Sequence, residues 1–253
     1  MMYEKFAMLY DALMADAPYD RWVEFVLNAR KLWNPSAKSV LDLACGTGEI
    51  GVRLAKLGFN VTGVDLSADM LTIAQQKASE TGVDIPFFQQ DMSELELPNR
   101  YDIIIIFCDS LNYLEREKEV VETFRRCQML LNDDGLLLFD VHSPAKIEKG
   151  FIDKTFAYNG EDVSYIWNCF PGEHPYSVEH ELTFFVYDER TGKYERFDEW
   201  HKERTFPIEQ YRDWLVECGF SILSIAGGFS FEPVSEHAER IFFCAQKVSG
   251  QTG

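Results

Sequence analysis

From Ser39 onward the sequence alternates short apolar or β-branched runs with longer segments of helical periodicity. Seven of these runs have the length and composition of strands: SVLDLA (39–44), NVTGVD (60–65), PFFQQD (86–91), YDIIIIF (101–107), GLLLFDV (135–141), FSILSIA (220–226) and RIFFCAQK (240–247). Such alternation is typical of a largely parallel sheet covered by helices, because each parallel connection needs a crossover segment. We therefore predict an α/β fold with a doubly wound sheet whose last strand is antiparallel.

The segments between these runs carry recognisable helix signals. Residues 49–57 have apolar side chains on one helical face and are followed by Gly58, which favours a helix C-terminus. Ser67 is suited to cap the next helix. An apolar stripe within residues 120–131 predicts a third helix, and a fourth begins near Pro207, which a first helical turn tolerates. We expect these stripes to pack on the sheet.

The alternation stops after Val141 and returns at Pro207. Between them, Asn159-Gly160 and Thr191-Gly192 are hairpin turn signals within a stretch rich in aromatic and β-branched residues. The strands that flank these turns are TFAY, VSYIWNCF, ELTFFVYD and KYERFDEW. We predict that residues 143–206 form an antiparallel β cap inserted into the α/β domain.

The formal net charge of −18 limits the classes of partner. A negative surface potential repels polyanions, and no basic patch larger than a pair of arginines is visible. The charge therefore argues against nucleic-acid partners and anionic membranes.

The N-terminal segment MMYEKFAMLYDALMADAPYD contains charged residues and lacks the continuous apolar core of a signal peptide. The longest apolar run, IIIIFC, suits a buried strand and is too short to span a membrane. Six cysteines without C-x-x-C pairs are typical of free thiols in a reducing compartment. We expect a cytoplasmic protein.

The segment VLDLACGTGEIG (40–51) has the G-x-G-x-x-G spacing that cradles a dinucleotide pyrophosphate. However, Asp42 precedes the glycines and Glu49 follows them, and acids beside the loop repel phosphates. S-adenosylmethionine fits better, because it carries an ammonium and a sulfonium group and its only anion is a carboxylate. A nicotinamide cofactor is the alternative.

Two further acids end the next two strands. Asp65 stands where a carboxylate accepts hydrogen bonds from vicinal ribose hydroxyls, which suits either cofactor. Asp91 is placed to accept from an adenine amine, with Met92 packing on the ring or offering its N–H. Together with Asp42, they predict one line of ligand contacts across the sheet.

These four segments, LDLACGTGEIG, VTGVDLSADML, QQDM and YDIIIIFCDSLNYL, resemble in order the motifs of class I S-adenosylmethionine-dependent methyltransferases. The resemblance covers residues 39–141 and the closing hairpin. It implies a Rossmann-like seven-stranded sheet formed by residues 1–142 and 207–253, with S-adenosyl-L-methionine as the cofactor. The cofactor contacts that it implies are Asp42, Ala44, Gly46, Thr47, Gly48, Asp65, Leu66, Met70, Asp91, Met92 and Cys108.

The segment LYDALMADAPYDRW resembles the leading segment of glycine/sarcosine N-methyltransferases, although the spacing of its tyrosines differs slightly. The resemblance implies that residues 1–36 form a helical lid and that Tyr10, Tyr19 and Trp22 contact the methionyl end or the substrate. Aromatic faces suit a sulfonium through cation–π attraction. The alternative is that these rings only pack an N-terminal helix on the domain.

Methyl transfer from a sulfonium is an in-line displacement, so the protein mainly holds nucleophile and methyl in a dry pocket. A base that helps to deprotonate the nucleophile would lie just past the strand ends, where the candidates are Asp109, Asn112, Tyr113 and His142. We select His142, Tyr113 and Asn112 as catalytic residues. The alternative for His142 is a polar residue that only ends a strand.

We expect the cap to shape the acceptor pocket. Its aromatic residues suggest a small, partly apolar acceptor, or else the cap's own core or a homodimer surface: Trp167, Phe170, Phe184, Tyr187 and Trp200. His174, His180, Glu181 and His201 are candidates for its inner face, although alternation alone does not assign that face. Their spacing matches no zinc or calcium motif, so no metal is expected.

The sequence therefore predicts an S-adenosylmethionine-dependent methyltransferase that acts on a nitrogen or oxygen atom of a small molecule. One alternative is an RNA methyltransferase, which the acidity disfavours because RNA binding usually needs a basic surface. The other is a non-catalytic cofactor-binding module, which the intact binding motifs do not support.

Overall fold

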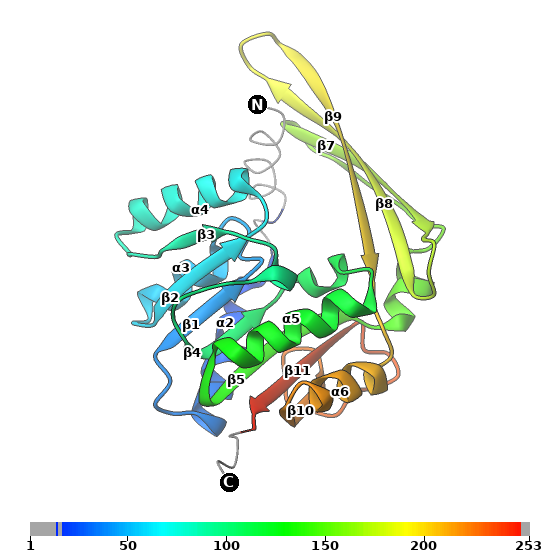
Figure 1. Ribbon diagram of the computed structural model, residues 1–253. Coiled ribbons are helices and arrows are strands. Elements are labelled where there is room, and N and C mark those ends of the chain that lie inside the picture. The colour runs from blue at the N-terminus through cyan, green and yellow to red at the C-terminus, as the bar shows by residue number, and fades with distance from the viewer. Residues whose placement is uncertain (1–13, 15–16, 249–253) are drawn as a thin grey trace.

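The computed structural model describes residues 14 and 17–248, and its centre is a seven-stranded sheet (Figure 1). The strands are β1 (Ser39–Leu43), β2 (Asn60–Asp65), β3 (Phe87–Gln89), β4 (Tyr101–Ile106), β5 (Leu131–His142), β10 (Phe220–Gly227) and β11 (Arg240–Lys247). Their order is β10-β11-β5-β4-β1-β2-β3, and β11 is antiparallel to both of its neighbours. The other pairings are parallel, which confirms the predicted sheet.

Helices cover both faces of this sheet. The helices α2 (Tyr19–Trp33), α3 (Glu49–Lys56) and α4 (Ala68–Thr81) pack into one core cluster, and α5 (Glu117–Leu130) and α6 (Ile208–Glu217) pack into the other. Phe25 and Phe242 belong to the first cluster, and Phe124 and Phe139 belong to the second. The alternating sides of the strands thus supply two separate cores, as expected for a doubly wound fold.

Local sequence signals set most of the element ends. The Ser67 hydroxyl accepts a hydrogen bond from the Met70 N–H at 3.3 Å, which confirms the predicted cap of α4. Pro207 precedes the first residue of α6 rather than lying in its first turn. The strand β5 starts at Leu131, four residues before the predicted Gly135, because Leu131 pairs with Tyr101 ahead of a register irregularity.

The inserted segment forms a second sheet with the order β6-β7-β8-β9. Its antiparallel strands are β6 (Thr155–Asn159), β7 (Val163–Pro171), β8 (Ser177–Asp188) and β9 (Lys193–Arg204). The two predicted hairpin turns join β6 to β7 and β8 to β9. In Figure 1 this sheet, which we call the cap sheet, rises beyond the carboxyl ends of the parallel strands. Ligands of open α/β folds bind at that edge.

In the described part of the chain, no helix combines the length and the apolarity needed to cross a membrane.

Candidate active site

The loop after β1 has the backbone geometry of a ligand cradle. Gly46 and Gly48 have φ angles of +53° and +78°, and Ala44 also has a positive φ of +54°. A Cβ atom on Gly46 would meet nothing within 4 Å, whereas one on Gly48 would lie 3.1 Å from the Cβ of Ala74. Gly46 therefore leaves open space beside the loop, while Gly48 allows α4 to pack closely against it.

Two acids surround this loop. Asp42 is buried, and its Oδ2 atom has no hydrogen-bond partner among the described residues. Burial, and then the nearby Asp65 carboxylate, raise the pKa of Asp42 to about 8. Asp65 accepts hydrogen bonds from the backbone N–H groups of Gly46 and Ser67, both at 2.8 Å. Asp65 therefore also ties the glycine loop to the end of β2.

Glu49 adds little negative charge to the loop, contrary to the sequence argument. Its carboxylate forms ion pairs with Lys77 and Arg53. The Lys77 ammonium also lies 3.3 Å from the Thr47 hydroxyl. The carboxyl groups left to face a cationic ligand at this loop are therefore those of Asp42 and Asp65.

The loops after β2 and β3 lie side by side, since the Gln90 N–H donates to the Asp65 carbonyl oxygen at 3.1 Å. Leu66 is largely exposed there, and Asp91 accepts from the N–H and hydroxyl of Ser93 at 2.7 and 2.8 Å. Met70 lies in the first turn of α4, and Met92 packs partly buried against the core. The predicted adenosine contacts thus gather on adjacent loops.

The N-terminal aromatic residues are packed in the fold. The Trp22 indole N–H donates to the buried Asp140 carboxylate at 3.2 Å, and the Trp22 ring meets Phe229 edge-on at 4.7 Å. Tyr19 is buried beneath the Arg53 guanidinium. Tyr10 lies outside the described residues. The packing interpretation accounts for Tyr19 and Trp22, and their contact with a cofactor stays a prediction.

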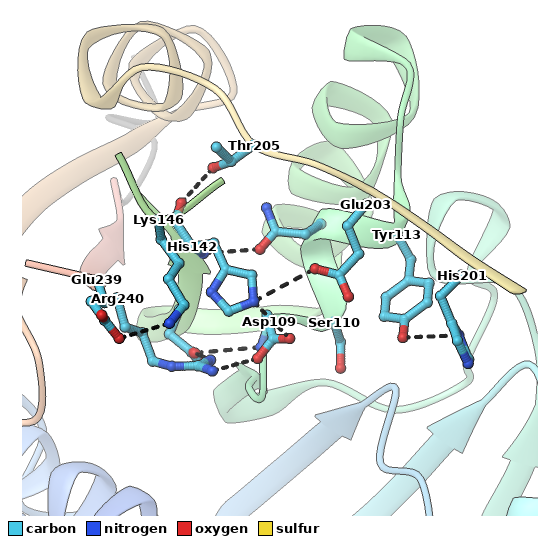
Figure 2. A network of polar contacts seen from close by, with 12 residues as sticks. Asp109, Ser110, Tyr113, His142, Lys146, His201, Glu203, Thr205, Glu239 and Arg240 are labelled. Carbon is cyan, nitrogen blue, oxygen red and sulfur yellow. Dashed lines mark hydrogen bonds and ion pairs between the residues drawn. The ribbon is translucent and has the colours of Figure 1, made fainter. Parts of the chain in front are cut away.

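A group of charged side chains, which we call the polar cluster, lies where the cap sheet meets the parallel sheet (Figure 2). It consists of Asp109 after β4, His142 at the end of β5, Glu203 near the end of β9, Arg240 at the start of β11 and Asp140. The His142 Nε2 atom lies 3.2 Å from Asp109 Oδ2 and 3.5 Å from Glu203 Oε2. Arg240 pairs with Asp109 Oδ1 at 2.6 Å and also with Asp140.

The acids and bases of the cluster shift one another's pKa values. Burial alone would raise the pKa of Asp109, but Arg240 and His142 outweigh it and hold this pKa well below its usual range. Burial disfavours charge on His142, yet Asp109 and Glu203 raise its pKa overall. Burial, and then repulsion by Asp109, raise the pKa of Glu203 to about 7. Perturbed groups gathered in one place are typical of functional sites.

The backbone is strained at Asp109 and at the residue before it. Cys108 and Asp109 both have φ angles of +55°, which non-glycine residues adopt rarely. Burial, and then the charges of Asp140 and Asp109, raise the pKa of the Cys108 thiol well above its usual value. Strained backbone persists only where the surrounding structure holds it, and such residues are found mostly at active sites and ligand sites.

The other predicted catalytic residues lie in the 3₁₀ turn η2 (Ser110–Tyr113). Asn112 is buried and fully engaged: its Oδ1 accepts from the His142 N–H, and its Nδ2 donates to the Arg204 carbonyl oxygen, both at 2.9 Å. Tyr113 is half exposed, and its hydroxyl lies 3.2 Å from His201 Nδ1. Asn112 thus holds the backbone of His142 and Arg204, while Tyr113 lies at the exposed edge of the polar cluster.

The register of the cap strands separates the cap candidates. His180 pairs with His201 across β8 and β9, and Glu203 lies two residues farther along the same face. His180 Nδ1 accepts from the Trp167 indole N–H at 3.0 Å, and His180 Nε2 is 3.7 Å from Glu203 Oε1. Glu181 lies on the opposite face and pairs with Asn168, and His174 is in an exposed turn.

Sequence reasoning missed Glu203, Arg240 and Asp140. The alternation of β9 contains a signal for Glu203, because residues 199, 201 and 203 share one face. Which face turns inward depends on how the cap sheet docks, and the strand itself does not encode it. Arg240 is a charged residue at a strand end, with no local feature that marks it.

Comparison with known proteins identifies similar chains. A family model described as a methyltransferase domain matches residues 40–135. A protein of Geobacillus sp. (strain WCH70) that carries a methyltransferase name is 55% identical over 98% of this chain and 100% of its own length. The glycine/sarcosine N-methyltransferase of Halorhodospira halochloris is 30% identical over 79% of this chain and 72% of its own.

A solved structure shows the same likeness in three dimensions. An S-adenosylmethionine-dependent methyltransferase from Clostridium acetobutylicum ATCC 824 matches with a TM-score of 0.89 at 30% identity, over 98% of this chain and 100% of that chain. The similarity therefore includes the cap sheet as well as the parallel sheet.

Proposed function

The chain belongs to the S-adenosylmethionine-dependent methyltransferases, and we propose that it transfers the cofactor's methyl group to a nitrogen or oxygen atom of a small molecule. The observation that carries this proposal is the polar cluster. Asp109 and His142 follow the ends of β4 and β5, and Glu203 from the cap sheet is buried against them. An acceptor bound there would be enclosed between the two sheets, which suits a small molecule.

The glycine loop fits the methionyl end of the cofactor. Gly46 leaves space beside the loop, and the buried Asp42 Oδ2 atom has no partner among the described residues. These features suit an ammonium group that approaches the backbone closely. We assign the ribose to Asp65 and the adenine to the loops that carry Leu66, Asp91 and Met92.

The cofactor supplies an electrophilic methyl group, and the protein's part is to position the nucleophile in line with it. We assign this task to the polar cluster, in which His142 comes from the parallel sheet and Glu203 from the cap sheet. Asn112 fixes the backbone beneath His142, and Tyr113 closes the rim with His201. The net charge of −18 disfavours RNA as the acceptor.

The cap, residues 143–206, belongs to the acceptor side in this proposal. The Halorhodospira halochloris relative is named for nitrogen methylation, which is one of the two acceptor chemistries that we propose.

Dimerisation through the cap stays a prediction. Several large side chains of the cap sheet are exposed and available to such a contact: Phe156, Ile166, Phe170, Tyr187 and Trp200. Light scattering on the purified protein tests it.

The test incubates the protein with S-adenosylmethionine that carries a labelled methyl group and a small-molecule extract of bacterial cells. We expect label in a small molecule, and Glu203→Gln should lose it while still binding S-adenosylhomocysteine. Glu199→Gln, on the same strand face, is the matched control and should keep it. Label in tRNA instead would overturn the acceptor class. Cofactor binding with no transfer to any fraction would favour the non-catalytic module.

A further inference from the structure

Three side chains of the polar cluster bring donor atoms to one point. Asp109, His142 and Glu203 each offer one ligand atom, and these atoms all lie within 4.8 Å of one another. The His142 Nε2 atom is 3.2 Å from the Asp109 oxygen and 3.5 Å from the Glu203 oxygen. Ligands bound to one metal ion at about 2.1 Å lie roughly 3.0–3.4 Å apart in octahedral or tetrahedral geometry. The two imidazole–carboxylate distances are close to that range.

The hydrogen bonds within the cluster leave one of the three potential metal-ligand atoms, a carboxylate oxygen, without a partner. Nε2 of His142 carries at most one proton, and its hydrogen-bond partner is Asp109 Oδ2 at 3.2 Å. Glu203 Oε2 has no hydrogen bond in the described structure, although Glu203 is only 6% exposed. An unpaired buried carboxylate oxygen is costly. A metal ion between the three groups would use a lone pair from each of them.

The surrounding residues hold the Asp109 side chain and the His142 backbone in place. Arg240 bonds Asp109 Oδ1 and leaves Oδ2 facing His142. The Thr205 hydroxyl donates to the His142 carbonyl oxygen at 2.6 Å, and Asn112 accepts from its N–H. Such outer contacts orient metal ligands in known sites.

The charges also balance around a divalent ion. When both are ionised as metal ligands, Asp109 and Glu203 carry two negative charges, which a divalent ion offsets. Arg240 is then shared between Asp109 and Asp140. One imidazole nitrogen and two carboxylate oxygens suit Mn²⁺, Fe²⁺, Co²⁺ or Zn²⁺ better than Ca²⁺ or Mg²⁺, which prefer oxygen ligands alone.

We propose that Asp109, His142 and Glu203 form a binding site for a divalent transition-metal ion. This departs from the sequence expectation that no metal is bound. The expectation was based on ligand spacing along the chain, and these ligands come from three separate segments, one of them in the cap. The ion would join β9 to the ends of β4 and β5. If the proposed function holds, it would also bind a heteroatom of the acceptor.

The experiment uses the full chain after dialysis against a chelator, with neither cofactor nor acceptor present. Calorimetric titration with Zn²⁺, and loss of the free Mn²⁺ electron paramagnetic resonance signal, should each report one ion per chain. Glu203→Gln keeps the shape but removes the charge, and it should weaken binding by roughly tenfold or more. Glu199→Gln should bind like the wild type. Binding of S-adenosylhomocysteine verifies that each variant is folded.

Two results would contradict the proposed metal site. One is that the wild type shows no saturable metal binding. The other is that Glu203→Gln binds the metal as well as the wild type does, which would place the ion elsewhere on the acidic surface. The outcome is separate from that of the proposed function. Methyl transfer without metal binding removes only the metal site. Metal binding without transfer to a small molecule removes only the proposed acceptor.

Discussion

Asn112 joins the two sheets at His142: its side-chain oxygen accepts from the His142 N–H at 2.9 Å, while its amide group donates to the carbonyl oxygen of Arg204. The last strand of the cap sheet is thereby fastened to the end of β5. Since both partners are backbone groups, the contact fixes the chain rather than any particular rotamer. This one buried side chain therefore holds both the backbone of His142 and the residue that follows Glu203.

We predict that Asn112→Ala lowers the free energy of unfolding by about 1–3 kcal/mol, because it leaves a buried N–H and a buried carbonyl unpaired. Methyl transfer should fall, while affinity for S-adenosylhomocysteine should not change. Asn112→Asp is a second variant: it keeps the acceptor for the His142 N–H but puts a buried carboxylate against the Arg204 carbonyl oxygen, so it should be destabilised as well. Urea unfolding and calorimetry measure both effects. Unchanged transfer in a destabilised Asn112→Ala variant would show that the two hydrogen bonds of Asn112 do not position the polar cluster for catalysis.

Gly46 and Gly58 provide a matched pair for testing the cofactor loop. Both have positive φ angles, +53° and +89°, and a Cβ on either would meet nothing within 4 Å. Alanine at each position should cost on the order of 1 kcal/mol of stability through the left-handed backbone. Only Gly46→Ala should also weaken S-adenosylhomocysteine binding, by roughly tenfold or about 1.4 kcal/mol. Equal affinities of the two variants in calorimetry would mean that the space beside Gly46 is not the cofactor's.

Local patterns were sufficient for most of the fold. The strand runs, the two hairpin turns and the Ser67 cap are encoded in short segments, and the structure has each of them. The position of Asp42 and Asp65, the acids proposed to bind the cofactor, could also be predicted, because parallel strands end at one edge and both residues stand at or near two of those ends. These features need no knowledge of long-range packing.

The polar cluster could be predicted only in part: the sequence indicated Asp109 and His142 but not their other partners. Glu203 and Arg240 reach the polar cluster only because β9 and β11 return to β5 from distant parts of the chain. Trp22 was expected either to contact the cofactor or to pack on the domain, and its bond to the distant Asp140 is a packing contact that its position in the chain does not indicate. Contacts of this kind depend on how the elements dock, which spacing along the sequence does not specify.

Asp42 should make stability depend on pH. Its pKa in the folded protein is about 8, raised by burial and by Asp65 from an ordinary value of 3.8. The folded state therefore holds a proton that the unfolded state has lost between these two pH values. Stability should fall as pH rises from about 4 to 8, by at most about 1.4 kcal/mol per pH unit, and the effect should level off above 8.

Asp42→Asn should remove this dependence while keeping the shape of the side chain. The gain in stability of the variant over the wild type should grow from pH 4 to 8 and then stay constant, as measured by denaturant unfolding without cofactor. A difference that does not vary with pH would show that Asp42 is already ionised at neutral pH in the folded protein.

The cap should control transfer without controlling cofactor binding, and the structure shows where it can be cut. Arg204 and Thr205 bond to Asn112 and His142, and Phe206 is buried in the core, so these residues anchor the cap to the α/β domain. Replacing residues 152–202 by a Gly/Ser linker should therefore leave a folded chain that binds S-adenosylhomocysteine and transfers no methyl group. Replacing residues 143–206 removes the three anchors as well and should be less stable. Binding and transfer are measured on the same preparation. Transfer that survives the shorter excision, or cofactor binding that disappears from a folded chain, would show that the cap does not act on the acceptor side alone.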